Sequence, residues 1–126
     1  MATTSQRFAF SYGGLRLLMT LIGLGPGFSR IEVLPAEVVV QMGWGFRARV
    51  PRRSITPAYE DQIRGLGIGV HGWRGRWLVN GSMSGIVTIE IEPPCRALAT
   101  GFPVKLRKLQ VSVEDPSGLV AAIGMR

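Results

Sequence analysis

A twelve-residue stretch, HGWRGRWLVNGS at positions 71–82, gathers the side chains that could do chemistry: the only histidine, His71, two of the three tryptophans and two arginines. A lone histidine acts as a general base only where a nucleophile and an orienting carboxylate come near it. The candidates for these roles are Ser82, Ser84, Glu60 and Asp61. Serines beside a glycine turn are ordinary, and no nucleophile-elbow pattern surrounds them. We therefore expect no catalytic residue and no enzyme.

The sequence contains no pattern typical of a metal site or a nucleotide-binding loop. His71 and Cys95 are the only residues of their kinds and lie far apart, so they cannot supply the three or four ligands of a zinc site. The stretch GLGIGVHG at 65–72 lacks the Gly-Lys-Ser/Thr ending of a phosphate-binding loop and precedes no helix-forming run. We expect no metal and no cofactor.

The chain is strongly basic. Fifteen basic residues against eight acidic ones give a formal charge of +7, and all but Lys105 and Lys108 of the basic residues are arginine. Such a balance is expected of a protein that meets phosphates. A composition rich in glycine, alanine, valine and arginine is also typical of a GC-rich genome, so the charge has a second interpretation without any partner.

The partner interpretation predicts a cationic surface with an aromatic edge, because several arginines stand at strand ends and loop entries, where no core packing requires them. The predicted anionic-partner site consists of Arg52, Arg53, Trp73, Arg74 and Arg76, with Arg47 and Arg49 on the same surface. An acidic protein or an anionic membrane surface would suit it. Nucleic acid fits less well, since no basic helix or aromatic ribonucleoprotein pattern is present.

Two alternatives stay open. One is a small-ligand-binding protein or enzyme whose pocket lies inside the sheet near His71, Tyr59 and Cys95. The other is a self-associating structural protein, a homo-oligomer that uses residues 15–25 as its contact.

Length and composition favour one domain over residues 1–126, with an apolar segment at 1–28 and a β core plus helix at 29–126. The run LRLLMTLIGLG at 15–25 is too short to span a bilayer and is interpreted as a retained strand or short helix. A single cysteine cannot form an internal disulfide, which indicates a reducing compartment. We expect a cytoplasmic protein, and its positive charge is compatible with a peripheral location at a membrane.

Alternating patterns predict most of the fold. WGFRARV places one set of side chains on a core face and Arg47 and Arg49 on a cationic face; the core set is Trp44, Phe46, Ala48 and Val50. SRIEVL and VVVQMG are strands joined by a turn at 35–37, and similar alternation covers 87–92 and 109–114, each solvated on one side. RWLVNGSMSGIVTIEI indicates a hairpin around Asn80–Gly81, with Trp77 facing the core.

The chain ends in a predicted helix over 116–123, capped by Asp115, with Leu119, Val120 and Ile123 as its apolar stripe. These elements predict a mainly β protein: a strongly bent antiparallel sheet or small barrel with a short C-terminal helix.

Three segments in this order resemble the small bacterial proteins of pleckstrin-homology-like (PH-like) fold: SRIEVLPAEVVVQMGWGFRARVPRRSI, GWRGRWLVNGSMSGIVTIEI and LQVSVEDPSGLVAAI. The resemblance covers about residues 29–123 and implies a PH-like barrel that serves as a binding or scaffold module. Its motifs are structural, and the basic pattern by which some eukaryotic members hold inositol phosphates is not matched. No lipid-binding residue is therefore carried over.

Overall fold

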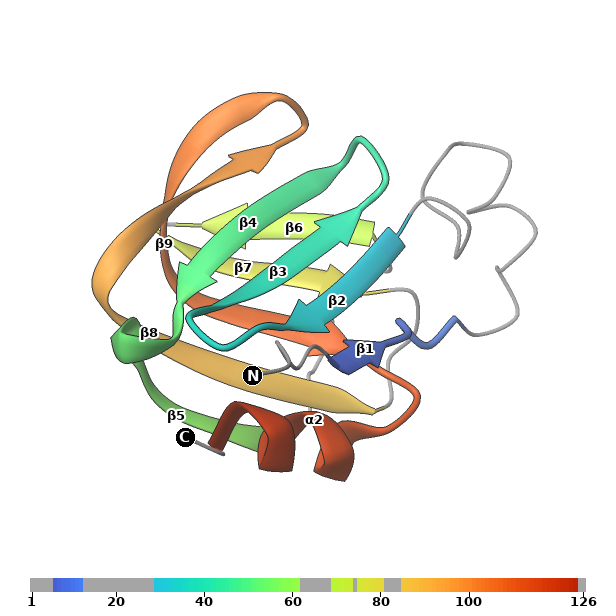
Figure 1. Cartoon of the computed structure of the whole chain (residues 1–126). Helices are drawn as coiled ribbons and strands as arrows, with labels where there is room; N and C mark the ends of the chain where they lie inside the picture. The colour runs from blue at the N-terminus through green and yellow to red at the C-terminus, as the bar shows by residue number, and fades with distance from the viewer. Residues whose placement is uncertain (1–5, 13–28, 62–68, 74, 81–84, 125–126) are drawn as a thin grey trace.

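The computed structural model describes residues 6–12, 29–61, 69–73, 75–80 and 85–124. Their strands are β1 (Gln6–Phe8), β2 (Ser29–Val33), β3 (Glu37–Met42), β4 (Phe46–Pro51), β5 (Ile55–Asp61), β6 (Gly69–Trp73), β7 (Arg76–Asn80), β8 (Ile86–Ala99) and β9 (Phe102–Ser112). A short 3-10 turn, η2 (Arg52–Ser54), joins β4 to β5, and one α-helix, α2 (Pro116–Gly124), ends the described chain (Figure 1).

The strands form one sheet in the order β1-β2-β3-β4-β8-β9-β7-β6, with β5 paired to β8 outside this path. The long β8 belongs to both parts of the sheet: its first half pairs with β5, and Ala97–Ala99 pair with β4. Between these parts, at 90–95, β8 and β9 shift register. Such an irregularity bends a strand, so the sheet folds over on itself (Figure 1).

The predicted fold class is therefore confirmed: the protein is mainly β, with a strongly bent sheet and a short C-terminal helix. In the described ranges the sheet is not closed, since no pairing joins β1 to β6. Its pairs are antiparallel apart from β7 and β9, which run parallel.

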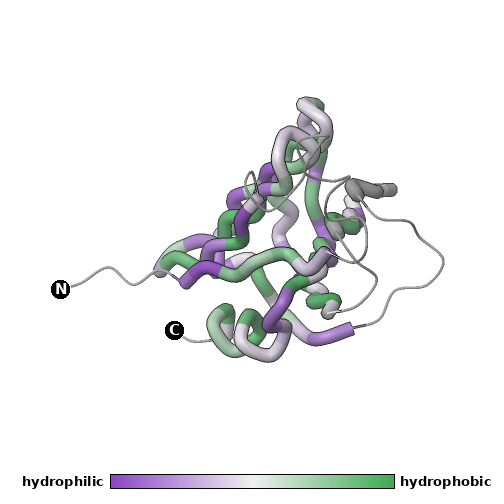
Figure 2. The backbone as a smooth tube through the Cα atoms, turned by 90° about the vertical axis from the view of Figure 1, so that its right-hand side faces the viewer, coloured by the Kyte–Doolittle hydropathy of each residue, from purple (hydrophilic) through white to green (hydrophobic). Residues whose placement is uncertain are grey.

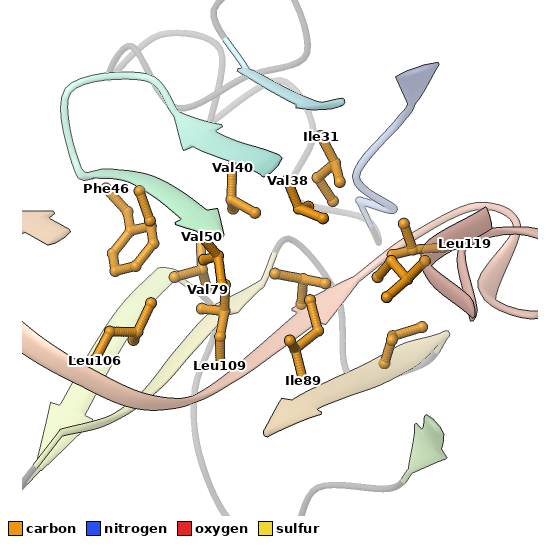
Figure 3. Close-up of a cluster of buried hydrophobic side chains, with 14 of the residues drawn as sticks. Ile31, Val38, Val40, Phe46, Val50, Val79, Ile89, Leu106, Leu109 and Leu119 are labelled. Carbon is orange, nitrogen blue, oxygen red and sulfur yellow. The ribbon is translucent and has the colours of Figure 1, made fainter. Parts of the chain in front are cut away.

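The hydrophobic core fills the inside of this bend. Figure 3 shows Ile31, Val38 and Val40 from β2 and β3 facing Ile89 and Leu109 from β8 and β9 across it. Phe10, from the N-terminal described segment, also lies in this core, and β1 pairs with β2. Part of the 1–28 segment is thus packed with the rest of the sheet, whereas the predicted contact at 15–25 lies outside the described residues.

Helix α2 begins and packs as the sequence predicts. The Asp115 carboxylate accepts a hydrogen bond of 3.0 Å from the Gly118 N–H, which is the expected N-cap contact. The helix packs against β5 and β8. Its buried side consists of Leu119, Ala122 and Ile123. Val120, predicted as part of the apolar stripe, is only half-buried, and Ala122 is buried in its place.

Two details of the predicted strands are wrong. Trp44 is not on the core face of β4, because a turn with positive φ at Gly43 occupies 43–45 and leaves Trp44 62% exposed. The predicted hairpin around Asn80–Gly81 does not form either, since β7 pairs with β6 and, in parallel, with β9 rather than with β8. The hairpin turn lies on the other side of β7, where Gly75 has a φ of +84°.

The face of β8 and β9 opposite the core is less solvated than its alternation suggests. Thr88 and Ser112 are fully buried. Thr88 donates a hydrogen bond of 2.8 Å to the Asp61 carboxylate and accepts one of 3.0 Å from Gln110. A polar residue at an alternating position therefore marks a hydrogen-bonded position here, not a solvated one.

Candidate anion-binding surface

The structure divides the predicted anionic-partner residues between two regions. Arg52 and Arg53 lie in η2, and Arg76 begins β7, where it pairs with Trp73 of β6 and with Lys108 of β9. Arg53 and Arg76 are exposed. The side chain of Trp73 and the whole of Arg74 lie outside the described residues, so the prediction for this set stays a prediction.

Arg52 has a structural role that the sequence prediction missed. Its guanidinium donates to the carbonyl oxygens of Ala122 and Ile123 at 3.1 and 2.8 Å and to that of Leu34 at 3.3 Å. Carbonyls in the last turn of a helix have no partner within the helix, and a cation there also interacts favourably with the helix dipole. Arg52 therefore joins η2 to the end of α2 and to the β2–β3 turn, contrary to the expectation that no packing requires it.

A second group of arginines lies around one hollow on the outer face of β4 and β8. The hollow has a volume of about 400 Å³. Its lining is Arg47, Ala48, Arg49, Arg96, Ala97, Leu98 and Pro103. Arg47 and Arg49 belong to the cationic surface expected from the sequence, whereas Arg96, Leu98 and Pro103 were not anticipated.

Strand register explains why these side chains meet. Arg47 pairs with Leu98, and Ala48 pairs with Ala97. Because side chains alternate along a strand, the buried alanines turn toward the core and their exposed neighbours, Arg47 and Arg96 among them, turn outward. The arginines thus lie on two paired neighbouring strands, β4 and β8.

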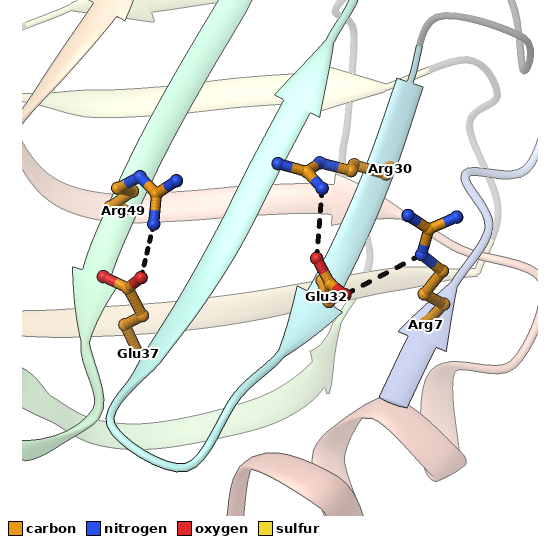
Figure 4. Close-up of polar contacts among 5 residues, drawn as sticks. All are labelled: Arg7, Arg30, Glu32, Glu37 and Arg49. Atoms are coloured by element: carbon orange, nitrogen blue, oxygen red, sulfur yellow. Dashed lines mark hydrogen bonds and ion pairs between the residues drawn. The ribbon is translucent and has the colours of Figure 1, made fainter. Parts of the chain in front are cut away.

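The charges around the hollow are only partly neutralised. Figure 4 shows the ion pair between Arg49 and Glu37. It also shows Glu32 paired with two arginines, Arg30 at 3.1 Å and Arg7 at 3.8 Å. Arg47 and Arg96 make no ion pair with any described carboxylate. Lys105 is the cross-strand partner of Arg96 and adds a further positive charge.

The remaining carboxylates lie elsewhere in the fold. They are on β5, on β8 up to its bend, or directly before α2: Glu60, Asp61, Glu90, Glu92, Glu114 and Asp115. The protein therefore has a cationic face over β4 and the far half of β8. Glu37 of β3, paired with Arg49, lies beside this face, whereas the six carboxylates named above lie in other elements or before the bend of β8. Such a distribution attracts anions to the hollow.

The residues of the alternative pocket are spread across the sheet. Tyr59 and His71 are connected by four successive cross-strand pairs: Tyr59–Thr88, Thr88–Gln110, Gln110–Leu78 and Leu78–His71. Four strand spacings place their backbones about 19 Å apart along the sheet. Tyr59 donates a hydrogen bond of 2.8 Å to Glu90, which favours the protonated phenol and raises its pKa. Burial raises the pKa of the half-buried Cys95 thiol. The side chain of His71 is outside the described part of the chain.

Among the described residues, no three histidine, cysteine, aspartate or glutamate side chains are grouped so that they could hold a metal ion. None of the helices in this part of the chain has the length and apolar character needed to cross a membrane. Comparisons with protein-family models, with curated proteins and with solved structures found no match to this chain.

Proposed function

We propose that this chain is a non-enzymatic binding module that holds an anionic group of its partner, a phosphate above all, in the hollow of Arg47, Arg49 and Arg96. One observation supports the proposal most directly: three arginines from two paired strands line a single hollow. Two of them, Arg47 and Arg96, have no carboxylate partner in the described ranges.

The chemistry of the lining suits this role. Guanidinium groups form forked hydrogen bonds to phosphate or carboxylate oxygens, and they stay charged at any physiological pH. A volume of about 400 Å³ is within the range of small-ligand sites. The other lining residues are alanine, leucine and proline, which offer no nucleophile and no general base. Binding without reaction is the function that such a lining supports.

The PH-like assignment belongs to the same proposal. The bent sheet followed directly by a terminal helix is the arrangement that the resemblance implies. A cytoplasmic location, with the protein peripheral to a membrane, is also part of the proposal and is supported by the excess of positive charge.

A thermal-shift titration with inorganic pyrophosphate tests the hollow. At a concentration ten times the Kd, binding stabilises the folded state by about 1.4 kcal/mol, which for a domain of this size raises Tm by about 5 °C. We expect the double variant Arg47→Gln, Arg96→Gln to lose most of this rise. The matched control is Arg53→Gln, which removes an exposed arginine of η2 and should keep it.

Two results would contradict the proposal. One is an equal loss of the Tm rise in the Arg53→Gln control. The other is an equal rise in sodium chloride of matched ionic strength, which would make the effect one of general salt rather than of a site.

A further inference from the structure

Two hairpin turns meet at the end of the molecule that carries the hollow. The β3–β4 turn occupies 43–45, and the β8–β9 turn consists of Thr100 and Gly101, with φ values of 48° and 85°. The Thr100 N–H donates a hydrogen bond of 2.8 Å to the Gly45 carbonyl, so the two turns are joined. Both lie at the top of Figure 1, and Figure 2, which keeps the same vertical direction, shows the described chain tapering toward this end.

The two turns carry most of the exposed large apolar side chains. Trp44 is 62% exposed, Leu98 is 42% exposed and Phe102 is 72% exposed, and Tyr59 on β5 is the one other such residue in the described ranges. Exposed apolar residues are ordinary when they are scattered. Here three of them lie on two hairpins joined by a hydrogen bond, which indicates a contact surface.

This surface is apolar on both sides of the β8–β9 hairpin. Leu98 pairs with Pro103, and Ala99 pairs with Phe102. Successive side chains on a strand point to opposite faces, so Leu98 and Phe102 lie on opposite faces of the hairpin. A flat protein surface would cover only one of these faces. A bilayer surrounds an inserted tip and removes both faces from water.

Basic side chains lie beside and behind the apolar tip. Arg47 pairs with Leu98, and Arg96, opposite Lys105, is two residues farther from the turn. At 3.3 Å per residue, Arg96 lies about 7 Å behind Leu98 and about 13 Å behind Thr100. Interfacial segments bury their apolar side chains about 5–10 Å into the boundary between headgroups and acyl chains, and cations beside them reach the lipid phosphates.

We propose that Trp44, Leu98 and Phe102 insert into the surface of an anionic lipid bilayer, while the arginine hollow holds a lipid phosphate. This proposal rests on the proposed function, since it names a lipid headgroup as the source of the anion. The apolar tip supplies attraction to the bilayer, and the arginines restrict it to anionic membranes.

Cosedimentation with phosphatidylcholine vesicles, with and without phosphatidylserine, tests the insertion. The tip variant is Trp44→Ser, Phe102→Ser, and the control is Tyr59→Ser, which removes the exposed aromatic side chain far from the hairpin turns. We expect wild type and control to pellet with anionic vesicles only. The tip variant should need at least about tenfold more lipid for half-binding, because two exposed aromatic side chains no longer enter the bilayer.

The pyrophosphate titration on the same samples separates this proposal from the proposed function. A tip variant that loses vesicle binding and keeps its Tm rise with pyrophosphate supports insertion. A tip variant that binds vesicles like wild type overturns insertion and leaves the hollow standing. Loss of both activities is resolved by Phe102→Leu, which must retain vesicle binding if the tip acts through its apolar character.

An acidic protein is the competing partner, and poly-glutamate is its probe. Wild-type protein that binds poly-glutamate but neither kind of vesicle would overturn the membrane proposal. Equal pelleting of wild type with neutral and anionic vesicles would also overturn it, because the arginines would then have no part in the contact.

Discussion

Replacing Arg52 with alanine tests the contact between η2 and the end of helix α2. The substitution removes hydrogen bonds of 2.8, 3.1 and 3.3 Å to the carbonyls of Ile123, Ala122 and Leu34. A hydrogen bond from a charged donor contributes about 1.5–3 kcal/mol when it is well formed, and only the shortest of the three is near the ideal length. Arg52 is half-buried, so water replaces part of what is lost.

The expected loss in the free energy of unfolding is about 2 kcal/mol, which includes the favourable interaction of the guanidinium with the helix C-terminus. Urea unfolding followed by circular dichroism measures it. Hydrogen exchange should show the loss first in the amides of α2, since the helix end is the element that Arg52 holds.

Arg53→Ala is the matched control, because Arg53 is the adjacent residue and its side chain is exposed. Its effect should stay within about 0.5 kcal/mol of wild type, as is usual for surface substitutions. Arg52→Lys should recover only part of the stability, since one ammonium group cannot match a guanidinium that contacts three carbonyls. Equal stabilities of Arg52→Ala and Arg53→Ala would refute the structural role of Arg52.

Three further predictions concern the burial of Leu119, the packing of Gly72 against Trp77 and the reactivity of Cys95. Leu119→Ala should lower the free energy of unfolding by about 2–5 kcal/mol in urea titrations, because Leu119 is fully buried, and a change of a few tenths would show that the helix is not docked. Gly72→Ala should cost about 1–3 kcal/mol, since the new methyl group overlaps the Trp77 ring, whereas Gly124→Ala meets no atom and should be neutral; equal effects would contradict that packing. Iodoacetamide should alkylate Cys95 at neutral pH at least about tenfold more slowly in the folded protein than in the urea-unfolded protein. Burial raises the pKa of the thiol and leaves less of the reactive thiolate, and equal alkylation rates would contradict this burial.

Local patterns were sufficient to predict the elements whose environment depends on near neighbours. The alternation in FRARV gave the inward Phe46 and the outward Arg47 correctly, because one face of β4 packs on the core. The Asp115–Pro116 pair predicted the start of α2 for a similar reason, since an N-cap acts on backbone groups within its own turn.

Predictions that depended on distant pairing failed. The sequence RWLVNGSMSGIVTIEI resembles a hairpin, yet β7 lies beside β9, whose residues come some thirty positions later. The role of Arg52 was invisible for the same reason, because its main acceptors are 70 and 71 residues away. No local signal distinguishes such a capping arginine from an exposed one.

The sequence predicted only part of the candidate site. The outward positions of Arg47 and Arg49 follow from the alternation in β4, but Arg96 joins them only through the pairing of β4 with β8. The sequence CRALA does hold a signal, since small residues alternate with Arg96 and Leu98 as they do in a strand that buries one face. That pattern gives the strand and its outward residues, whereas the partner strand comes from the fold.

Anion binding in the hollow is tested most directly by observing the arginine side chains themselves. We propose an NMR titration of the Nε–Hε signals of the wild-type protein with inorganic pyrophosphate at constant ionic strength. We expect saturable shifts with one shared midpoint for Arg47, Arg49 and Arg96, while Arg53 and Arg76 stay nearly unchanged. Small, linear and equal shifts at all arginines would contradict it, because they would describe a general ion atmosphere and no site.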